Sequence, residues 1–144
     1  MDSIDIFTDG SALSNSKNSS AGWAVYFPIF DILRSGHMIG TNNAAELRAI
    51  DYGLWYTYVK LNVKKGMTIN IKTDSQYSID VITGVKKSYA NLEVLSRISS
   101  HIMELKKIDI TINFIHVDAH TKRTDKDSIY NDIVDKEARR QASK

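Results

Sequence analysis

The sequence contains no cysteine, so it can form neither a disulfide framework nor a thiolate zinc site. Its single proline, Pro28, fits a chain without a linker or a low-complexity tract. No hydrophobic run approaches the roughly 18 residues that suggest a membrane span. The start of the chain, with acidic Asp2 and Asp5, does not have the pattern of a signal peptide. We therefore expect a soluble intracellular protein, most simply a cytoplasmic one, with no membrane contact.

The composition is that of an ordinary globular protein. Apolar residues make up 42% and charged residues 25% of 144 residues, which suits one domain with a buried core. We expect a single domain over residues 1–144. The net charge is only +2, but lysine and arginine gather in short clusters, among them residues 60–65 and 139–140. Such clusters are typical of solvated helix faces, and they would also suit a polyanion held by its phosphates.

The hydrophobic pattern predicts a mixed sheet with helices packed on it. Five strands are expected, over residues 3–9, 22–27, 32–39, 67–73 and 108–117. Four helices are expected, over residues 42–61, 75–82, 92–105 and 128–142. An asparagine, Asn42 or Asn43, is expected to cap the first helix, because its side chain can accept hydrogen bonds from free amides. The element order favours an α/β fold, in which ligands gather at the carboxyl ends of the strands.

Four carboxylates stand in distinctive local settings. Asp9 ends the first expected strand, and Asp74 follows the fourth. Glu46 lies near the start of the first long helix, and Asp135 lies in the last helix. Each acid alone could be a helix cap or a surface group. Together they predict a site for a hard divalent metal ion, because oxygen ligands are what Mg²⁺ and Mn²⁺ prefer.

The segments around these acids resemble the type 1 ribonuclease H family. The matching segments are Phe7-Thr8-Asp9-Gly10-Ser11, Thr41-Asn42-Asn43 with Ala45-Glu46-Leu47, Thr73-Asp74-Ser75-Gln76-Tyr77, His120, and Asn131-Asp132-Ile133-Val134-Asp135 with Ala138-Arg139. The resemblance covers nearly the whole chain. It implies a ribonuclease H-like fold, with a five-stranded mixed sheet (an antiparallel meander plus parallel strands) flanked by helices. It also implies an endonuclease that hydrolyses the RNA strand of RNA–DNA hybrids to 5′-phosphate and 3′-hydroxyl ends, and we expect a monomer.

The resemblance assigns roles to individual residues. Asp9, Glu46, Asp74 and Asp135 match the family's catalytic acids, which are expected to hold two Mg²⁺ ions, with Mn²⁺ able to substitute. His120 matches a catalytic loop histidine that assists proton movement or product release. Six positions match contacts to the hybrid: Asn15, Thr41, Asn42, Asn43, Ser75 and Gln76. Trp55, on the first long helix, is expected to serve packing rather than base stacking.

The sequence departs from the family pattern in three respects. Ala119 precedes His120 where the family usually has glycine, in a loop that is longer than is common. The connection over residues 84–91 is too short for the basic protrusion of many bacterial relatives, so we expect weaker substrate binding. Three alternatives remain open: a DNA-cutting enzyme of the same fold, a ribonuclease H domain of a reverse transcriptase, and a catalytically weak hybrid-binding module.

Overall fold

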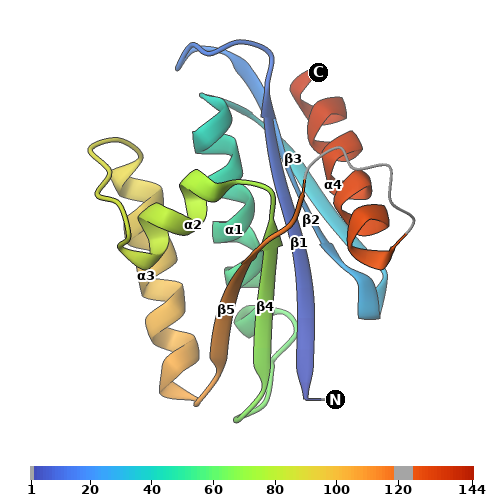
Figure 1. Ribbon diagram of the computed structural model, residues 1–144, viewed down its shortest axis with the longest axis vertical. Helices are drawn as coiled ribbons and strands as arrows, with labels where there is room; N and C mark the ends of the chain where they lie inside the picture. The colour runs from blue at the N-terminus through green and yellow to red at the C-terminus, as the bar shows by residue number, and fades with distance from the viewer. Residues whose placement is uncertain (1, 119–124) are drawn as a thin grey trace.

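The computed structural model describes residues 2–118 and 125–144, which fold as a central sheet with helices on both faces (Figure 1). The strands are β1 (Ser3–Ala12), β2 (Ser20–Phe27), β3 (Ile32–Ile39), β4 (Thr68–Thr73) and β5 (Thr111–His116). The helices are α1 (Asn42–Val59), α2 (Gln76–Thr83), α3 (Leu92–Lys107) and α4 (Lys126–Ala142), with a short 3-10 turn η1 (Pro28–Phe30). The predicted element order is confirmed. Within the described ranges, no helix is both long enough and apolar enough to cross a membrane.

The sheet has the order β3-β2-β1-β4-β5 and is mixed, as predicted. The pairs β1–β2 and β2–β3 are antiparallel, whereas β1–β4 and β4–β5 are parallel. The parallel ladder between β1 and β4 ends where Thr8 lies opposite Thr73. β1 itself runs on to Ala12, because β2 still pairs with it there, so the prediction that Asp9 ends the strand was wrong. Asp9 and Asp74 nevertheless follow directly after the last parallel pair.

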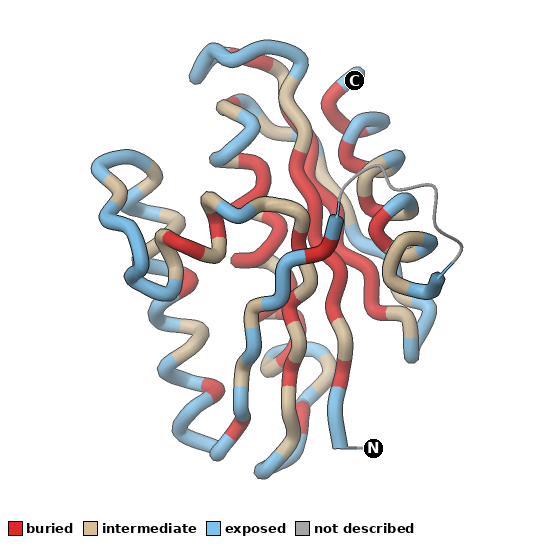
Figure 2. The backbone as a smooth tube through the Cα atoms, in the orientation of Figure 1, coloured by how far each residue is buried: buried red, intermediate tan, exposed pale blue. Residues whose placement is uncertain are grey.

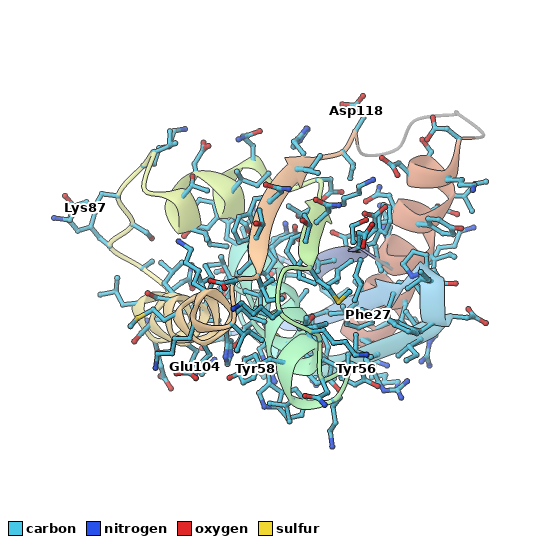
Figure 3. All side chains as sticks on the ribbon, turned by 90° about the horizontal axis from the view of Figure 1, so that it is seen from below. Phe27, Tyr56, Tyr58, Lys87, Glu104 and Asp118 are labelled. Atoms are coloured by element: carbon cyan, nitrogen blue, oxygen red, sulfur yellow. The ribbon has the colours of Figure 1, made fainter. Side chains whose placement is uncertain are left out.

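Side chains of β1 alternate between two hydrophobic clusters, since successive residues of a strand point to opposite faces. Ile4 and Ile6 join the larger cluster, which contains residues of α1 and α3. Phe7 joins the smaller cluster, with Val134 and Ala138 of α4. Figure 3 shows α1 and α3 on one side of the sheet and α4 on the other. Figure 2 shows that buried residues are concentrated in the central strands.

The start of α1 differs from the prediction in its capping residue. Thr41, rather than Asn42 or Asn43, is the N-cap, with extended backbone angles and a hydroxyl that accepts a hydrogen bond from the Ala44 amide at 3.1 Å. Threonine is a favourable cap because its oxygen satisfies one of the free amides of the first turn. Because Thr41 is the cap, the side chains of Asn42 and Asn43 are not needed for capping. Asn42 Oδ1, for example, accepts a hydrogen bond from the Ala12 amide at 3.3 Å.

Helix α4 is tied to strand β3 through Glu137. Arg140 donates to this carboxylate from Nε and Nη2, at 2.7 Å each. Ser35 of β3 donates a short hydrogen bond to Glu137, and Gln141 donates to both Ser35 and Glu137. The hydrogen bonds from Arg140 are the largest cause that lowers the pKa of Glu137, to about 2. The charged form of Glu137 therefore contributes to the attachment of α4.

Replacing Glu137 with glutamine is expected to lower the free energy of unfolding at pH 7 by about 1–2 kcal/mol. The whole pKa shift of Glu137 would correspond to a larger free energy of unfolding. The estimate is lower because Arg140 is largely exposed and solvent screens its attraction to Glu137. The lowered pKa fixes the pH dependence. The contribution is complete above about pH 5, where glutamate also ionises in the unfolded chain, and it is lost as the pH falls toward 2.

Urea denaturation of Glu137→Gln and the parent protein between pH 2 and 7 measures this difference. Glu104→Gln is the matched control, because Glu104 is half-exposed and its salt bridge, to Lys107, lies within its own helix. An equal loss in both variants, or a loss that does not shrink at low pH, would contradict the role of Glu137.

Candidate active site

Three carboxylates converge where the parallel strands end. Asp9 comes from β1, Asp74 from the turn between β4 and α2, and Glu46 from the second turn of α1. Each offers an oxygen, and these oxygens all lie within 4.8 Å of one another. Asp9 and Asp74 meet because their strands are neighbours in parallel register. The structure therefore brings together three of the four acids that the sequence predicts.

Gly10, in β1, lies directly against the start of α1. Its amide donates to Asp9 Oδ1 at 2.9 Å and to Glu46 Oε1 at 2.6 Å. A Cβ atom at this position would lie 2.2 Å from the backbone nitrogen of Glu46 and 2.3 Å from the carbonyl carbon of Ala45. Only glycine allows the strand and the helix to approach this closely. The closeness is what places Glu46 beside Asp9.

The two innermost acids are buried. Asp9 and Glu46 are each only 3% exposed. Burial raises the pKa of Asp9 far above its usual range, and the charge of Glu46 raises it further. Burial also raises the pKa of Glu46, with the charge of Asp74 as an additional cause. Crowded, desolvated carboxylates of this kind are costly unless a proton or a cation neutralises them.

The donor set fits a hard divalent cation. Glu46 Oε2 is buried, and no hydrogen-bond donor reaches it in the described part of the chain. Carboxylate oxygens are the preferred ligands of Mg²⁺ and Mn²⁺, and a buried oxygen without a donor is free to coordinate. The site can therefore hold a divalent ion between Asp9, Glu46 and Asp74.

The metal-free protein is expected to lose stability as the pH rises from about 4 to about 8. Because folding raises the pKa of Asp9 and Glu46, the folded chain retains protons that the unfolded chain releases above about pH 4. Each step up in pH then favours the unfolded chain. Mg²⁺ or Mn²⁺ should restore stability at high pH, because the cation binds the folded form.

Melting temperatures at pH 5 and pH 8, in chelator and in Mg²⁺, measure this effect. Asp9→Asn should flatten the pH dependence in chelator, since it removes one of the crowded charges. A parent melting temperature that rises toward pH 8 in chelator, or that Mg²⁺ leaves unchanged there, would contradict the prediction.

Asp135 lies at the same hollow, where it is paired with Arg139. The hollow has a volume of about 390 Å³, and Asp9, Glu46, Asp74 and Asp135 all line it. Asp135 Oδ1 accepts a hydrogen bond from Arg139 Nε at 3.2 Å, one helical turn further along α4. Asp135 is not part of the three-carboxylate cluster. Its role as a metal ligand stays a prediction.

The residues predicted to contact a substrate are only partly brought together. Asn42, Asn43, Ser75 and Gln76 line the same hollow as the acids. Thr41 does not line it and serves as the cap of α1, while Asn15 is exposed in the β1–β2 connection and does not line it either. His120 lies outside the described residues.

Four residues that line the hollow were not predicted to act there: Gly10, Ser11, Tyr77 and Arg139. Arg139 lines the hollow through its ion pair with Asp135, and the spacing of four residues on one helix could have indicated this pair. Gly10 contributes its backbone amide to both buried acids. No property of a glycine in a strand-like sequence would have indicated that second role.

Fold and site together define an α/β protein of the ribonuclease H-like class. The family model described as RNase H matches residues 1–143, so the chain belongs to the RNase H family. This confirms the resemblance on which the residue assignments rest.

Individual relatives agree with the family assignment. The chain is 31% identical over 129 residues to a protein of Acanthamoeba polyphaga mimivirus named "Probable ribonuclease H", which covers 81% of this chain. The chain spans only 56% of that relative's length. Among solved structures, the chain is similar to LC11-RNase H1, a protein isolated from compost and solved in complex with an RNA/DNA hybrid. The TM-score is 0.75 and the identity 21%, and the match covers 97% of this chain and 96% of the other. The chain is also similar to the N-terminal RNase H domain of a Mycobacterium tuberculosis protein, with a TM-score of 0.73 and 19% identity over 99% and 95%. At these identities the structures support the fold.

Proposed function

We propose that this protein is a metal-dependent endoribonuclease that hydrolyses the RNA strand of RNA–DNA hybrids. The observation that carries the proposal is the convergence of Asp9, Glu46 and Asp74 within 4.8 Å at the edge of a ribonuclease H-like sheet. Membership of the RNase H family supports the choice of substrate. A solved relative of the same fold is complexed with an RNA/DNA hybrid, which is the substrate class proposed here.

The acids of the hollow have the role of holding two Mg²⁺ ions, for which Mn²⁺ substitutes. Asp9, Glu46 and Asp74 are the inner ligands, and Asp135 completes the set from α4. Two such cations, when bound there, would supply an activated water and relieve charge on the departing 3′-oxygen, giving 5′-phosphate and 3′-hydroxyl ends. Arg139 pairs with Asp135 at 3.2 Å and so helps to hold it at the rim of the hollow.

The polar residues around the acids are suited to distinguishing RNA from DNA. Asn42 engages its Oδ1 with the Ala12 amide, so its amide nitrogen can donate to a 2′-hydroxyl. Asn43 and Ser75 lie at the same hollow, on the first turn of α1 and at the cap of α2. Gln76 donates to Asp80 at 2.9 Å, which leaves its side-chain oxygen as an acceptor. His120 is proposed to assist proton movement or product release.

A strand-labelled hybrid digest tests the proposal. We expect cleavage of the RNA strand in Mg²⁺ or Mn²⁺, no cleavage of the DNA strand, and no cleavage in chelator. Duplex DNA of the same sequence is the control that separates this activity from that of a DNA-cutting enzyme of the same fold. Hybrid binding without turnover in either cation would instead support a catalytically silent binding module.

A further inference from the structure

A second hollow, separate from the Asp9–Glu46–Asp74 cluster, lies between α1 and α3. It has a volume of about 320 Å³, and we call it the α1–α3 hollow. It is lined by Arg48, Asp51, Tyr52, Trp55, Arg97 and His101. At about 100° per residue, Asp51 and Trp55 lie roughly 140° and 180° around α1 from Glu46. The hollow therefore faces away from the acids, and Figure 1 shows α3 running beside α1.

The buried residue of this hollow is Asp51, and basic side chains compensate its charge. The side chain of Asp51 is 5% exposed. Its Oδ2 accepts hydrogen bonds from Arg48 Nη1 at 3.2 Å and Arg97 Nε at 3.0 Å. Its Oδ1 lies 2.7 Å from His101 Nε2, while the other ring nitrogen of His101 is bonded to the Tyr58 hydroxyl. Because both Asp51 oxygens are already satisfied, the hollow is not suited to a cationic ligand.

The arginines of the hollow retain donors for an anion. A guanidinium carries five N–H groups. Arg48 uses Nη1 for Asp51, and Arg97 uses Nε for Asp51 and Nη1 for the exposed Glu93. The side chains of Arg48 and Arg97 are 36% and 46% exposed, so the remaining groups can be reached from solvent. The bidentate geometry of such groups suits a phosphate.

The remaining wall of the hollow is aromatic. Tyr52 and Trp55 have ring centroids 5.5 Å apart, and both rings pack partly against the core. The packing expected of Trp55 is present, but the residue is only partly buried, so part of its surface remains open to a ligand. The same two side chains also line the hollow. Lys60 Nζ lies 5.8 Å from the Trp55 ring centroid and adds positive charge at this end. An aromatic surface beside guanidinium groups is the combination that proteins use to stack a base while holding its phosphate.

We propose that the α1–α3 hollow binds a nucleotide of a single nucleic-acid strand, with its phosphate on Arg48 and Arg97 and its base against Trp55. The volume lies at the lower end of the range for small-ligand sites, which suits one nucleotide. The inference rests on the proposed function for the kind of ligand, because a nuclease acting on hybrids also meets their unpaired ends. The role of the hollow is then to hold a strand that continues beyond the paired region.

The test measures the binding of a short labelled oligothymidylate in the presence of chelator. Fluorescence anisotropy gives the affinity at each of several salt concentrations. Trp55→Leu should weaken binding at least about fivefold without changing the salt dependence, whereas Trp55→Phe should retain most of it. Arg97→Gln should weaken binding and lower the slope of log K against log salt by about one, the value for one phosphate contact. Arg97→Lys keeps the charge beside Asp51 and controls for loss of folding, which a thermal melt checks for every variant.

Equal binding by the parent, Trp55→Leu and Arg97→Gln would overturn this inference. So would inorganic phosphate that competes as strongly as thymidine monophosphate, because the base would then contribute nothing. The same variants should cleave a short blunt hybrid at the parent rate. Cleavage of that hybrid by a parent protein that binds no single strand overturns this inference alone. Trp55-dependent binding without any hybrid cleavage overturns the proposed function alone.

Discussion

Asp9→Asn is expected to reduce hydrolysis of the RNA strand at least about a thousandfold while leaving the protein folded. Asparagine keeps the shape of the side chain but removes one charge and one anionic ligand oxygen. Asp9 belongs to the cluster whose three oxygens all lie within 4.8 Å of one another, and it is only 3% exposed. The same substitution should raise the melting temperature in chelator, because it relieves the burial of a crowded charge.

Single-turnover cleavage in saturating Mg²⁺ and thermal melts in chelator measure the two effects of Asp9→Asn. Asp109→Asn is the matched control: its side chain is 65% exposed and pairs with Lys65 at 3.4 Å, and it lies before β5, at the end of the parallel strands opposite the acids. We expect the control to stay within about twofold of the parent rate, as a surface change away from the site should. A rate for Asp9→Asn within tenfold of the parent would exclude Asp9 as a metal ligand of the reaction.

Gly10→Ala is expected to lower the free energy of unfolding by about 3 kcal/mol or more and to impair cleavage strongly. The added methyl group would meet backbone atoms, at 2.2 Å from the Glu46 nitrogen and 2.3 Å from the Ala45 carbonyl carbon. Backbone cannot rotate away as a flexible side chain can, so β1 and α1 must separate. Separation moves Glu46 away from Asp9 and weakens the hydrogen bonds that the Gly10 amide donates to both.

Gly53→Ala provides the comparison for Gly10→Ala. Gly53 is also buried and lies in α1, but the nearest atoms to an added Cβ are side-chain carbons of Ile6 and Val25 at 3.4 Å. Alanine is also the better helix former, by about 1 kcal/mol. Denaturation curves should therefore place Gly53→Ala within about 1 kcal/mol of the parent. If Gly10→Ala proves equally mild, the close approach of β1 and α1 is not what positions Glu46.

Part of this site could be predicted from the sequence because it depends on strand periodicity alone. Asp9 and Asp74 each follow a run with strand pattern, and two parallel neighbours bring such positions to one edge. The fold class and element order follow from the same periodicities. By contrast, three adjacent residues at the start of α1 can all act as caps. The choice of Thr41 depends on backbone angles and on the position of β1, which the sequence does not display.

Contacts between distant elements were beyond what the sequence could predict. The second role of the Gly10 amide requires the distance from β1 to α1, and a glycine offers no side chain to indicate it. The α1–α3 hollow requires Arg97 and His101 of α3 to lie opposite Asp51 and Trp55 of α1. The helical pattern of α3 shows which residues share a face, but not which surface that face meets.

One hydrogen of the backbone is placed to report on the state of the buried acids. The Gly10 amide proton points at an oxygen of Asp9 and an oxygen of Glu46 at once. When either acid is protonated, or coordinates a cation, electron density is withdrawn from the oxygen that this amide proton faces. The nuclear magnetic resonance signal of Gly10 should therefore move with both pH and metal titration, giving a spectroscopic view of the buried acids without any added label.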